Sequence, residues 1–430
     1  MHCSFKYNLL MILAVVIGGQ GFAEAQQGRF EQKEFVIGAF WIIHPDGESL
    51  DRRFAEIAEG HFTLVFGPIP GSSPAEFVAL AAKHDLAAIV MSRGVVPEKL
   101  PRQEACWGYR VFDEPSATMF PTLKVRSDEI LKVHPGKLDY INLFPNYASE
   151  KQLGVGELMP RRASPALYEQ YVKSYVEQLD PAVISFDHYP LFRPDKDGQS
   201  ARTTKSRKLY YEKLAVIRKH ALERDIPFWN YFNAVPFGPH TEPTAAQLRW
   251  QIYSSISYGA RGVLYFTYGT PRTFEFPRGG GLIDSTGRRT RNWYDAQRIN
   301  ARIKHLGPTL MQLTSTAVVR VEPGTETVEA LKGMALRNIT PLDEFGGDPA
   351  NDYLVGMFTH EDGRRAVMLT NYRIAYRARP TVEFDISAER VTEVDQRTGK
   401  EVTVVDESPA IEGLQISLDA GEGRLFLLPR

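Results

Sequence analysis

Eight short apolar segments, each followed by a stretch with helical spacing, constrain the fold of this chain more than any other feature. Most of them are continuous apolar runs bounded by Gly, Pro or Asn, which is typical of parallel strands covered on both faces. The segments are Phe35–Phe40, Phe62–Phe66, Ala87–Met91, Gly108–Phe112, Leu138–Leu143, Val183–Phe186, Pro227–Tyr231 and Gly262–Thr267.

The stretches between these segments carry apolar residues at the spacing of one helix face. The clearest stripes are Leu167, Tyr171, Tyr175 and Leu179; Leu209, Lys213, Leu214, Ile217 and Ala221; and Leu248, Ile252 and Ile256. Pro97 and Pro101 leave little room for a helix between the third and fourth strands. Eight strand–helix units predict a closed β/α barrel, a TIM barrel, over residues 30–313. The alternative is a doubly wound open sheet, but the glycine-rich dinucleotide loop expected after its first strand is not present.

After Leu313 the pattern changes to short alternating runs separated by turns. A chain of 430 residues is too long for one ordinary core, so a second domain is expected. The alternation predicts an antiparallel β-sandwich over residues 314–430. Its expected strands are Thr316–Val321, Leu354–Phe358, Ala366–Tyr372, Thr381–Phe384 and Arg424–Leu428, with turns at Asp362-Gly363 and Thr398-Gly399.

The N-terminus has the features of an export signal. Lys6 supplies a positive charge, Leu9–Ile17 a short apolar run, and Ala23-Glu24-Ala25 a small-x-small cleavage site. We therefore expect a signal peptide over residues 1–25, cleaved after Ala25, and a secreted or periplasmic protein. The alternative is an anchor that is never removed. Removal of the signal leaves Cys106 as the one cysteine, which we expect to be buried in the core.

The charge balance limits the partners that the chain is expected to bind. The 51 basic and 52 acidic residues nearly cancel and form no long basic run, so nucleic acid and anionic membranes are not expected partners. No later apolar stretch is long enough to span a membrane. The pattern assigns no oligomeric state.

Two acidic runs follow predicted barrel strands, and the carboxyl ends of barrel strands carry the active site in this fold. The fourth strand leads into Asp113-Glu114-Pro115, and the sixth into Asp187-His188-Tyr189-Pro190. Crowded carboxyl groups near an apolar barrel mouth favour a raised pKa, as a general acid needs. Alternatively, Asp113 and Glu114 cap a helix or pair with an arginine such as Arg93, and Asp187 and His188 form a structural pair.

Aromatic residues at several strand ends could stack on the apolar faces of sugar rings. They are Trp41, Tyr147, Tyr189, Trp229, Tyr231 and Tyr268. Packing in the core is the alternative for each one taken singly.

Other chemistries fit the sequence less well. His44 stands alone after the first strand, where metal-dependent barrel hydrolases carry paired histidines, and no Gly-x-Ser-x-Gly elbow or Walker loop is present. We expect neither a metal ion nor a cofactor.

The barrel resembles the clan A glycoside hydrolases, most nearly the β-galactosidase-like barrels. In that clan the fourth strand commonly ends Asn-Glu-Pro, which Asp113-Glu114-Pro115 matches with Asn replaced by Asp. Tyr189-Pro190 and Tyr265-Phe266-Thr267-Tyr268 are similar to the sixth- and eighth-strand ends of such barrels. The resemblance covers roughly residues 34 to 313, and it implies that Glu114 is the acid/base residue.

The sequence departs from the clan at the seventh strand, which ends in a Glu nucleophile in the family. Here the stretch is Phe228-Trp229-Asn230-Tyr231-Phe232-Asn233, and the nearest carboxylates are Asp187 and Glu242. We therefore expect Glu114 to be the general acid and Asp187 the base or nucleophile. The residues expected to bind substrate are Trp41, Asp113, Tyr147, His188, Tyr189, Trp229, Asn230, Glu242 and Tyr268.

These observations favour a secreted glycoside hydrolase that acts on an oligosaccharide or polysaccharide of an extracellular or periplasmic glycan. The missing seventh-strand Glu keeps open a second hypothesis, a secreted carbohydrate-binding protein that has kept the barrel and lost the chemistry. A third hypothesis is a lyase or another barrel hydrolase.

Overall fold

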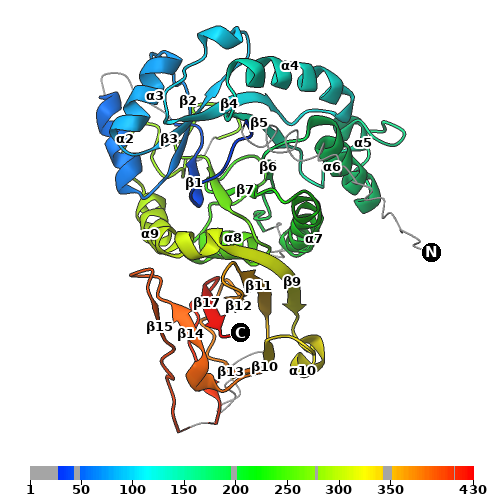
Figure 1. Ribbon diagram of the computed structural model, residues 1–430, viewed down its shortest axis with the longest axis vertical. Helices are drawn as coiled ribbons and strands as arrows, with labels where there is room; N and C mark the ends of the chain where they lie inside the picture. The colour runs from blue at the N-terminus through cyan, green and yellow to red at the C-terminus, as the bar shows by residue number, and fades with distance from the viewer. Residues whose placement is uncertain (1–27, 43–48, 195–200, 277–278, 342–350, 411) are drawn as a thin grey trace, which may run out of the picture.

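The computed structural model describes residues 28–42, 49–194, 201–276, 279–341, 351–410 and 412–430. The predicted signal peptide and His44 lie outside these ranges. The first part of the chain is a closed barrel of eight parallel strands, with β1 paired to both β2 and β8 (Figure 1). This closure confirms the predicted barrel and excludes the open sheet. The strands are β1 (Val36–Ala39), β2 (Leu64–Gly67), β3 (Ala87–Met91), β4 (Cys106–Asp113), β5 (Leu138–Leu143), β6 (Ile184–Asp187), β7 (Phe228–Asn233) and β8 (Gly262–Phe266).

Helices surround the barrel and follow the predicted apolar stripes. Capping boxes at Ser73 and Thr244 help to fix where α3 and α8 begin. Between β3 and β4 the chain makes only a short 3₁₀ turn, Pro97–Lys99, as the prolines there predict. The helices are α2 (Leu50–Glu59), α3 (Pro74–Lys83), α4 (Phe120–Val133), α5 (Glu150–Leu153), α6 (Pro165–Leu179), α7 (Ala201–Arg224), α8 (Ala245–Ser257) and α9 (Arg291–Met311). No helix in the described ranges is long and apolar enough to cross a membrane.

The barrel interior is packed with side chains rather than hollow. Trp229 and Tyr140 stack there with ring centroids 6.0 Å apart. Glycine makes room for them: a Cβ atom at Gly262 would lie 2.5 Å from Cδ1 of Trp229. Outside the strands, a larger apolar core joins the barrel to its helices and includes the buried Cys106, as predicted. A ligand therefore has to bind at an end of the barrel and not inside it.

The C-terminal part consists of two antiparallel sheets that share an apolar core, as predicted for a β-sandwich. The larger sheet has the order β15-β14-β17-β12-β11-β9 and the smaller has the order β10-β13-β16. Their strands are β9 (Leu313–Val321), β10 (Leu336–Thr340), β11 (Tyr353–His360), β12 (Arg365–Asn371), β13 (Thr381–Phe384), β14 (Thr392–Val394), β15 (Glu401–Thr403), β16 (Leu414–Gln415) and β17 (Gly423–Leu428). A short helix, α10 (Thr327–Ala330), follows β9.

The larger sheet docks against the barrel through α8. Gly356 of β11 approaches α8 so closely that a Cβ atom there would lie 2.3 Å from the carbonyl oxygen of Ser257. The hydroxyl groups of Ser257 and Thr370 are 3.0 Å apart across the same contact. Leu354, Met368 and other residues of this face belong to the barrel's outer core, so the two domains share buried apolar surface.

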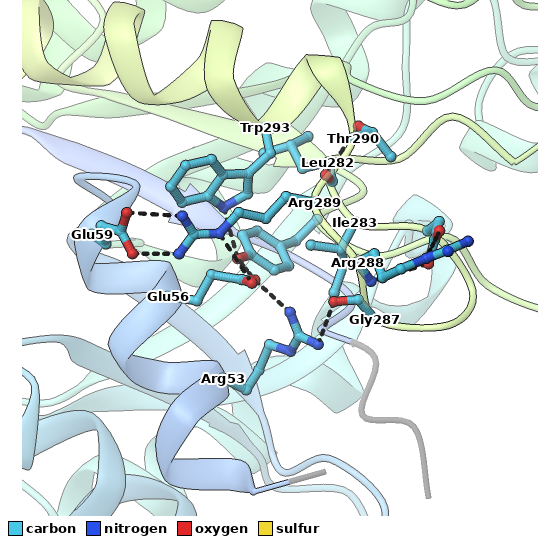
Figure 2. A network of polar contacts seen from close by, with 12 residues as sticks. Arg53, Glu56, Glu59, Leu282, Ile283, Gly287, Arg288, Arg289, Thr290 and Trp293 are labelled. Carbon is cyan, nitrogen blue, oxygen red and sulfur yellow. Dashed lines mark hydrogen bonds and ion pairs between the residues drawn. The ribbon is translucent and has the colours of Figure 1, made fainter.

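A buried polar network ties the loop between β8 and α9 to helix α2 (Figure 2). The carboxylate of Glu56 accepts hydrogen bonds from Arg53, from the Tyr268 hydroxyl at 2.6 Å and from Arg289 Nε at 3.3 Å. The Arg289 guanidinium lies 3.7 Å from the ring centroid of Trp293 and also pairs with Glu59. Glu56 is therefore the centre of the network, whereas Glu59 lies at its solvent side.

We expect Glu56→Gln to lower the free energy of unfolding by about 3 kcal/mol, because it removes the negative charge that faces the fully buried Arg53. Glu59→Gln is the matched control on the same helix, with a side chain 53% exposed against 13% for Glu56. It should cost less than about 1 kcal/mol, as exposed ion pairs do. Urea unfolding of the two variants checks this, and equal losses would contradict the central role of Glu56.

Candidate active site

A cavity of about 1270 Å³ opens at the carboxyl ends of the barrel strands. Its wall is largely aromatic and apolar, and its carboxyl groups lie on the β4 and β6 side. The polar lining residues from β4, β5 and β6 are Arg110, Asp113, Glu114, Asn142 and Asp187. A large apolar pocket with a few convergent polar groups is the usual form of a small-molecule binding site.

Glu114 follows β4 in a backbone conformation that is uncommon for residues other than glycine, with φ of 50°. Its N–H donates to the carbonyl oxygen of Asn142, at 2.8 Å, which ties it to β5. A register shift between Arg110 and Phe112 in the β4–β5 pairing precedes it. Strained backbone of this kind persists where the surrounding structure holds it, and it is often found at functional sites.

Asp187 ends β6 and is almost fully buried. Because side chains alternate along a strand, Asp187 faces the same side as Ser185. The Ser185 hydroxyl forms hydrogen bonds with the side chains of Tyr140 and Asn142 inside the barrel. The carboxyl groups of Asp187 and Glu114 lie within hydrogen-bonding distance of each other. The structure thus brings together the two carboxyl groups that the sequence analysis expected to be catalytic.

Burial, together with the neighbouring charges of Asp187 and Asp113, raises the pKa of Glu114 to about 9. Burial also raises the pKa of Asp187, to about 6, although the nearby Lys213 ammonium opposes this shift. The pair therefore loses its protons in two well-separated steps. Between them, Glu114 holds a proton while Asp187 is ionised, so the site offers an acid and a base at neutral pH.

Asp113 lies at the rim of the cavity and is about half exposed. The arginine that pairs with it is Arg110, with Nη2 2.6 Å from Oδ2 of the carboxylate. The Arg110 guanidinium also lies 5.2 Å from the ring centroid of Phe40. Asp113 is thus partly neutralised and has a different environment from the adjacent Glu114.

Four of the six aromatic residues expected at strand ends line the cavity: Trp41, Tyr147, Tyr189 and Tyr231. Trp41 follows β1 with φ of 56° and leaves 39% of its side chain exposed, which makes its indole ring available for stacking. The other aromatic lining residues are Phe40, Phe66, Phe144, Phe237 and Phe266.

The structure does not bring Trp229 or Asn230 to the cavity. Trp229 points into the packed barrel interior, where its indole N–H donates to Gln32 at 2.9 Å. Asn230 has the opposite orientation, and its amide donates to Tyr210 and Ser255 on the surrounding helices. Both residues lie in the middle of β7, and strand alternation sends one to each side of the wall.

His188, Tyr268 and Glu242 also lie outside the cavity lining. The His188 ring is fully buried against Tyr147 and Tyr210. The Tyr268 hydroxyl donates to Glu56 in the network of Figure 2. Glu242, in the loop after β7, pairs with Arg291 at 3.6 Å and accepts a bond from Asn292.

His240 and Lys213 are among the residues near the site to which the sequence assigned no role. His240 lines the cavity, and its Nδ1 donates to the carbonyl oxygen of Leu191 at 3.1 Å, so its Nε2 is an acceptor. Burial lowers the pKa of His240 to about 4, which keeps the ring neutral. Lys213 is buried behind Asp187, and its position in an otherwise apolar stripe of α7 was the signal that could have identified it.

Among the described residues, the carboxylates that line the cavity come from β4 and β6, and β7 contributes Tyr231 in place of an acid. No cluster of three or more His, Cys, Asp or Glu residues that could hold a metal ion is found in the described ranges.

We expect Glu114→Gln to raise the free energy of unfolding at pH 7 by on the order of 2 kcal/mol. The folded-state pKa of Glu114 lies above its ordinary value of 4.5, so its contribution to stability is present at acid pH and is lost as the pH rises toward 9. The amide is a neutral isostere and does not incur this loss. Urea unfolding at pH 4.5 and pH 7 measures the difference, with Glu129→Gln, at an exposed site on α4, as the control. A gain that does not depend on pH would contradict the raised pKa.

No family model matches the sequence, and no curated protein matches it. Solved structures do match. A catalytic mutant of Gan42B, a GH42 β-galactosidase from G. stearothermophilus, aligns with a TM-score of 0.54 and 10% identity over 92% of this chain and 98% of that one. A second structure of Gan42B gives a TM-score of 0.51 at 10% identity with the same coverage.

A β-galactosidase from the psychrophilic Marinomonas ef1 aligns with a TM-score of 0.42 and 12% identity over 63% of this chain. The present chain spans 60% of the length of that enzyme. The likeness to Gan42B concerns the fold, and it agrees with the resemblance to clan A barrels that the fourth-strand motif indicates. The chain thus has a glycoside hydrolase-like fold, similar to that of a GH42 β-galactosidase.

Proposed function

We propose that this protein is a glycoside hydrolase in which Glu114 is the general acid and Asp187 is the base or nucleophile. The observation that carries the proposal is the carboxyl pair at the mouth of the barrel. Its two members have pKa values of about 9 and about 6, so one is protonated and the other ionised at neutral pH. The glycoside hydrolase-like fold supports the same reaction class.

In this reaction, Glu114 gives its proton to the glycosidic oxygen as the bond to the anomeric carbon breaks. Asp187 either attacks the anomeric carbon or takes a proton from the water that attacks it. In the first case water then cleaves the glycosyl–Asp187 bond and gives a proton back to Glu114. In the second case Asp187 ends protonated and Glu114 ionised, and the proton has to pass from Asp187 to Glu114 before the next turnover. Burial of both groups excludes competing solvent and strengthens their interaction with the developing charges.

The spacing of the pair has a consequence for substrate binding. Retaining enzymes hold their carboxyl groups about 5–5.5 Å apart, and inverting enzymes about 6.5–9.5 Å apart. In this structure Glu114 and Asp187 contact each other through their carboxyl groups, and a sugar that binds at both groups replaces this contact. The separation reached in the complex then decides between retention and inversion.

The cavity favours an oligosaccharide or the end of a polysaccharide as substrate. Its volume of about 1270 Å³ exceeds the roughly 300–1,000 Å³ typical of small-molecule sites, so it has room for more than one sugar ring. Trp41, Tyr147 and Tyr189 offer aromatic faces to these rings. Because Gan42B is a β-galactosidase, β-galactosides are the first substrates to test.

The test is hydrolysis of aryl glycosides and oligosaccharides by the wild-type protein, by Glu114→Gln and by Asp187→Asn. We expect each variant to lower kcat by a hundredfold or more, about the contribution of one acid–base group, while glycan binding is retained. Asp180→Asn, at an exposed site after α6, is the control and should leave the rate unchanged.

Two outcomes would contradict the proposal. A wild-type protein that binds glycans and cleaves none would favour the carbohydrate-binding hypothesis, which the lack of a carboxylate on β7 motivates. Hydrolysis that survives both substitutions would show that the catalytic carboxyl groups are elsewhere.

We also propose that the protein is exported to the periplasm or secreted, so that it meets an extracellular or periplasmic glycan. The basis is the Lys6, Leu9–Ile17 and Ala23-Glu24-Ala25 pattern. Expression of the full chain in a bacterial host should give an exported protein whose N-terminal residue, measured by mass spectrometry, is Gln26. An intact Met1 on a protein that stays in the cytoplasm would contradict this.

A further inference from the structure

Lys213 is a fully buried amine in the middle of α7. A lysine ammonium is costly to remove from water, so it is almost never fully buried unless it is paired. Its neighbours in the stripe, among them Leu214 and Ile217, are also fully buried, so the side chain starts from an apolar surface of the helix. The groups that compensate for the burial must therefore lie at the tip of the side chain.

The tip of Lys213 reaches the ends of two barrel strands. Its Nζ donates to the carbonyl oxygen of Asp187 at 2.5 Å and to that of Phe144 at 3.1 Å. Phe144 directly follows β5 and lines the cavity. The ammonium thus joins the ends of β5 and β6 from the side opposite to the cavity.

Aromatic faces complete the surroundings of this ammonium. Nζ lies 4.6 Å from the ring centroid of Phe186 and 5.3 Å from that of Tyr168. Such faces attract a desolvated cation. The Tyr168 hydroxyl donates to the same Phe144 carbonyl oxygen, at 3.1 Å. Carbonyl oxygens and aromatic faces favour the charged form of the amine.

The charge of Lys213 acts on the carboxyl pair. It lowers the pKa of both Asp187 and Glu114, and in return the two carboxyl groups raise the pKa of Lys213, which burial lowers to about 7. Another cation that lines the cavity is Arg110, and its charge is paired with Asp113. The remaining titratable groups around Asp187 are acids, phenols and a neutral imidazole. They are Asp113 from β4, Tyr147 after β5, Tyr168 from α6, and His188 and Tyr189 after β6.

We propose that Lys213 is a positioning residue for the proposed reaction: its buried ammonium fixes the ends of β5 and β6 and keeps Asp187 ionised beside a protonated Glu114. This inference rests on the proposed function for its role in catalysis. The alternative is that Lys213 only bridges two strand ends and has no effect on ionisation.

The pH dependence of kcat/KM distinguishes the two roles. Lys213→Met removes the charge and keeps a side chain of similar length. Loss of the cation should move the acid limb of the profile to higher pH by about one unit or more, because a nearby opposite charge shifts a carboxyl pKa by about 1–3 units. Lys213→Arg retains the charge and should keep the acid limb near its wild-type position.

Lys219→Met on the same helix is the matched control. Lys219 is exposed and pairs with Glu169 at the surface, so this variant should have the wild-type profile. An unchanged acid limb in Lys213→Met, with a lower rate at every pH, would overturn the proposal in favour of the purely structural role.

A double-mutant cycle tests the same link without any enzyme assay. Lys213→Met should lower the Tm more in the wild-type background than in Asp187→Asn at pH 7, where Asp187 is ionised. This difference should disappear at pH 4.5, because protonation of Asp187 removes its charge. If Lys213→Met does not fold, Lys213→Arg replaces it in the cycle. Because Lys213→Arg keeps the positive charge, it should lower the Tm equally in the wild-type and Asp187→Asn backgrounds.

The two experiments separate this inference from the proposed function. A protein that hydrolyses no glycoside would refute the function, yet the cycle would still decide whether Lys213 stabilises the ionised form of Asp187. Equal Tm losses in both backgrounds and at both pH values would overturn the inference even for an active enzyme.

Discussion

The site depends on one unfavourable contact, the close approach of the Glu114 and Asp187 carboxyl groups in a buried environment. Two such groups cannot both ionise cheaply, so one keeps its proton and the pair becomes an acid and a base. The rest of the barrel mouth holds this contact in place. Asn142 accepts the N–H of Glu114, Arg110 takes up the charge of Asp113, and Lys213 lies behind Asp187. The contact between the two carboxyl groups lowers the stability of the folded protein. It therefore persists because the surrounding residues hold the two groups in place.

The fold could be predicted from the sequence because its elements are locally consistent. Most of the eight barrel strands are apolar runs, and the helices between them carry an apolar stripe and in several cases a capping residue. The strands that were not predicted in the β-sandwich include β14, β15 and β16, which are only two or three residues long. Segments this short do not show a period, and their pairing is decided by the neighbouring strands of the sheet.

The candidate site could be predicted only as far as its position along the chain. Glu114 and Asp187 follow strands, and the barrel geometry brings strand ends together. The sequence does not indicate which way each side chain points. Adjacent residues of a strand face opposite sides, so a shift of one position moves a side chain from the cavity to the core. Asp187 and Tyr231 face the cavity, whereas Trp229 and Asn230 do not. Lys213 was missed for another reason: it lies 26 residues beyond Asp187 on a helix, and only the tertiary structure brings its Nζ to the strand end.

The β-sandwich has a physical connection to the site through the same helix. It contacts α7 on each side of Lys213: Arg207 donates to the carbonyl oxygen of Tyr372 at 2.6 Å, and Arg218 donates to the Ser315 hydroxyl at 2.8 Å. The Arg207 guanidinium also lies beside the rings of Trp250 and Tyr372, at 5.0 and 4.8 Å from their centroids. Because Lys213 projects from α7 onto the ends of β5 and β6, a helix held at both ends limits how far its ammonium can move. The second domain thus helps to hold the helix that carries Lys213, and none of its described residues lines the cavity.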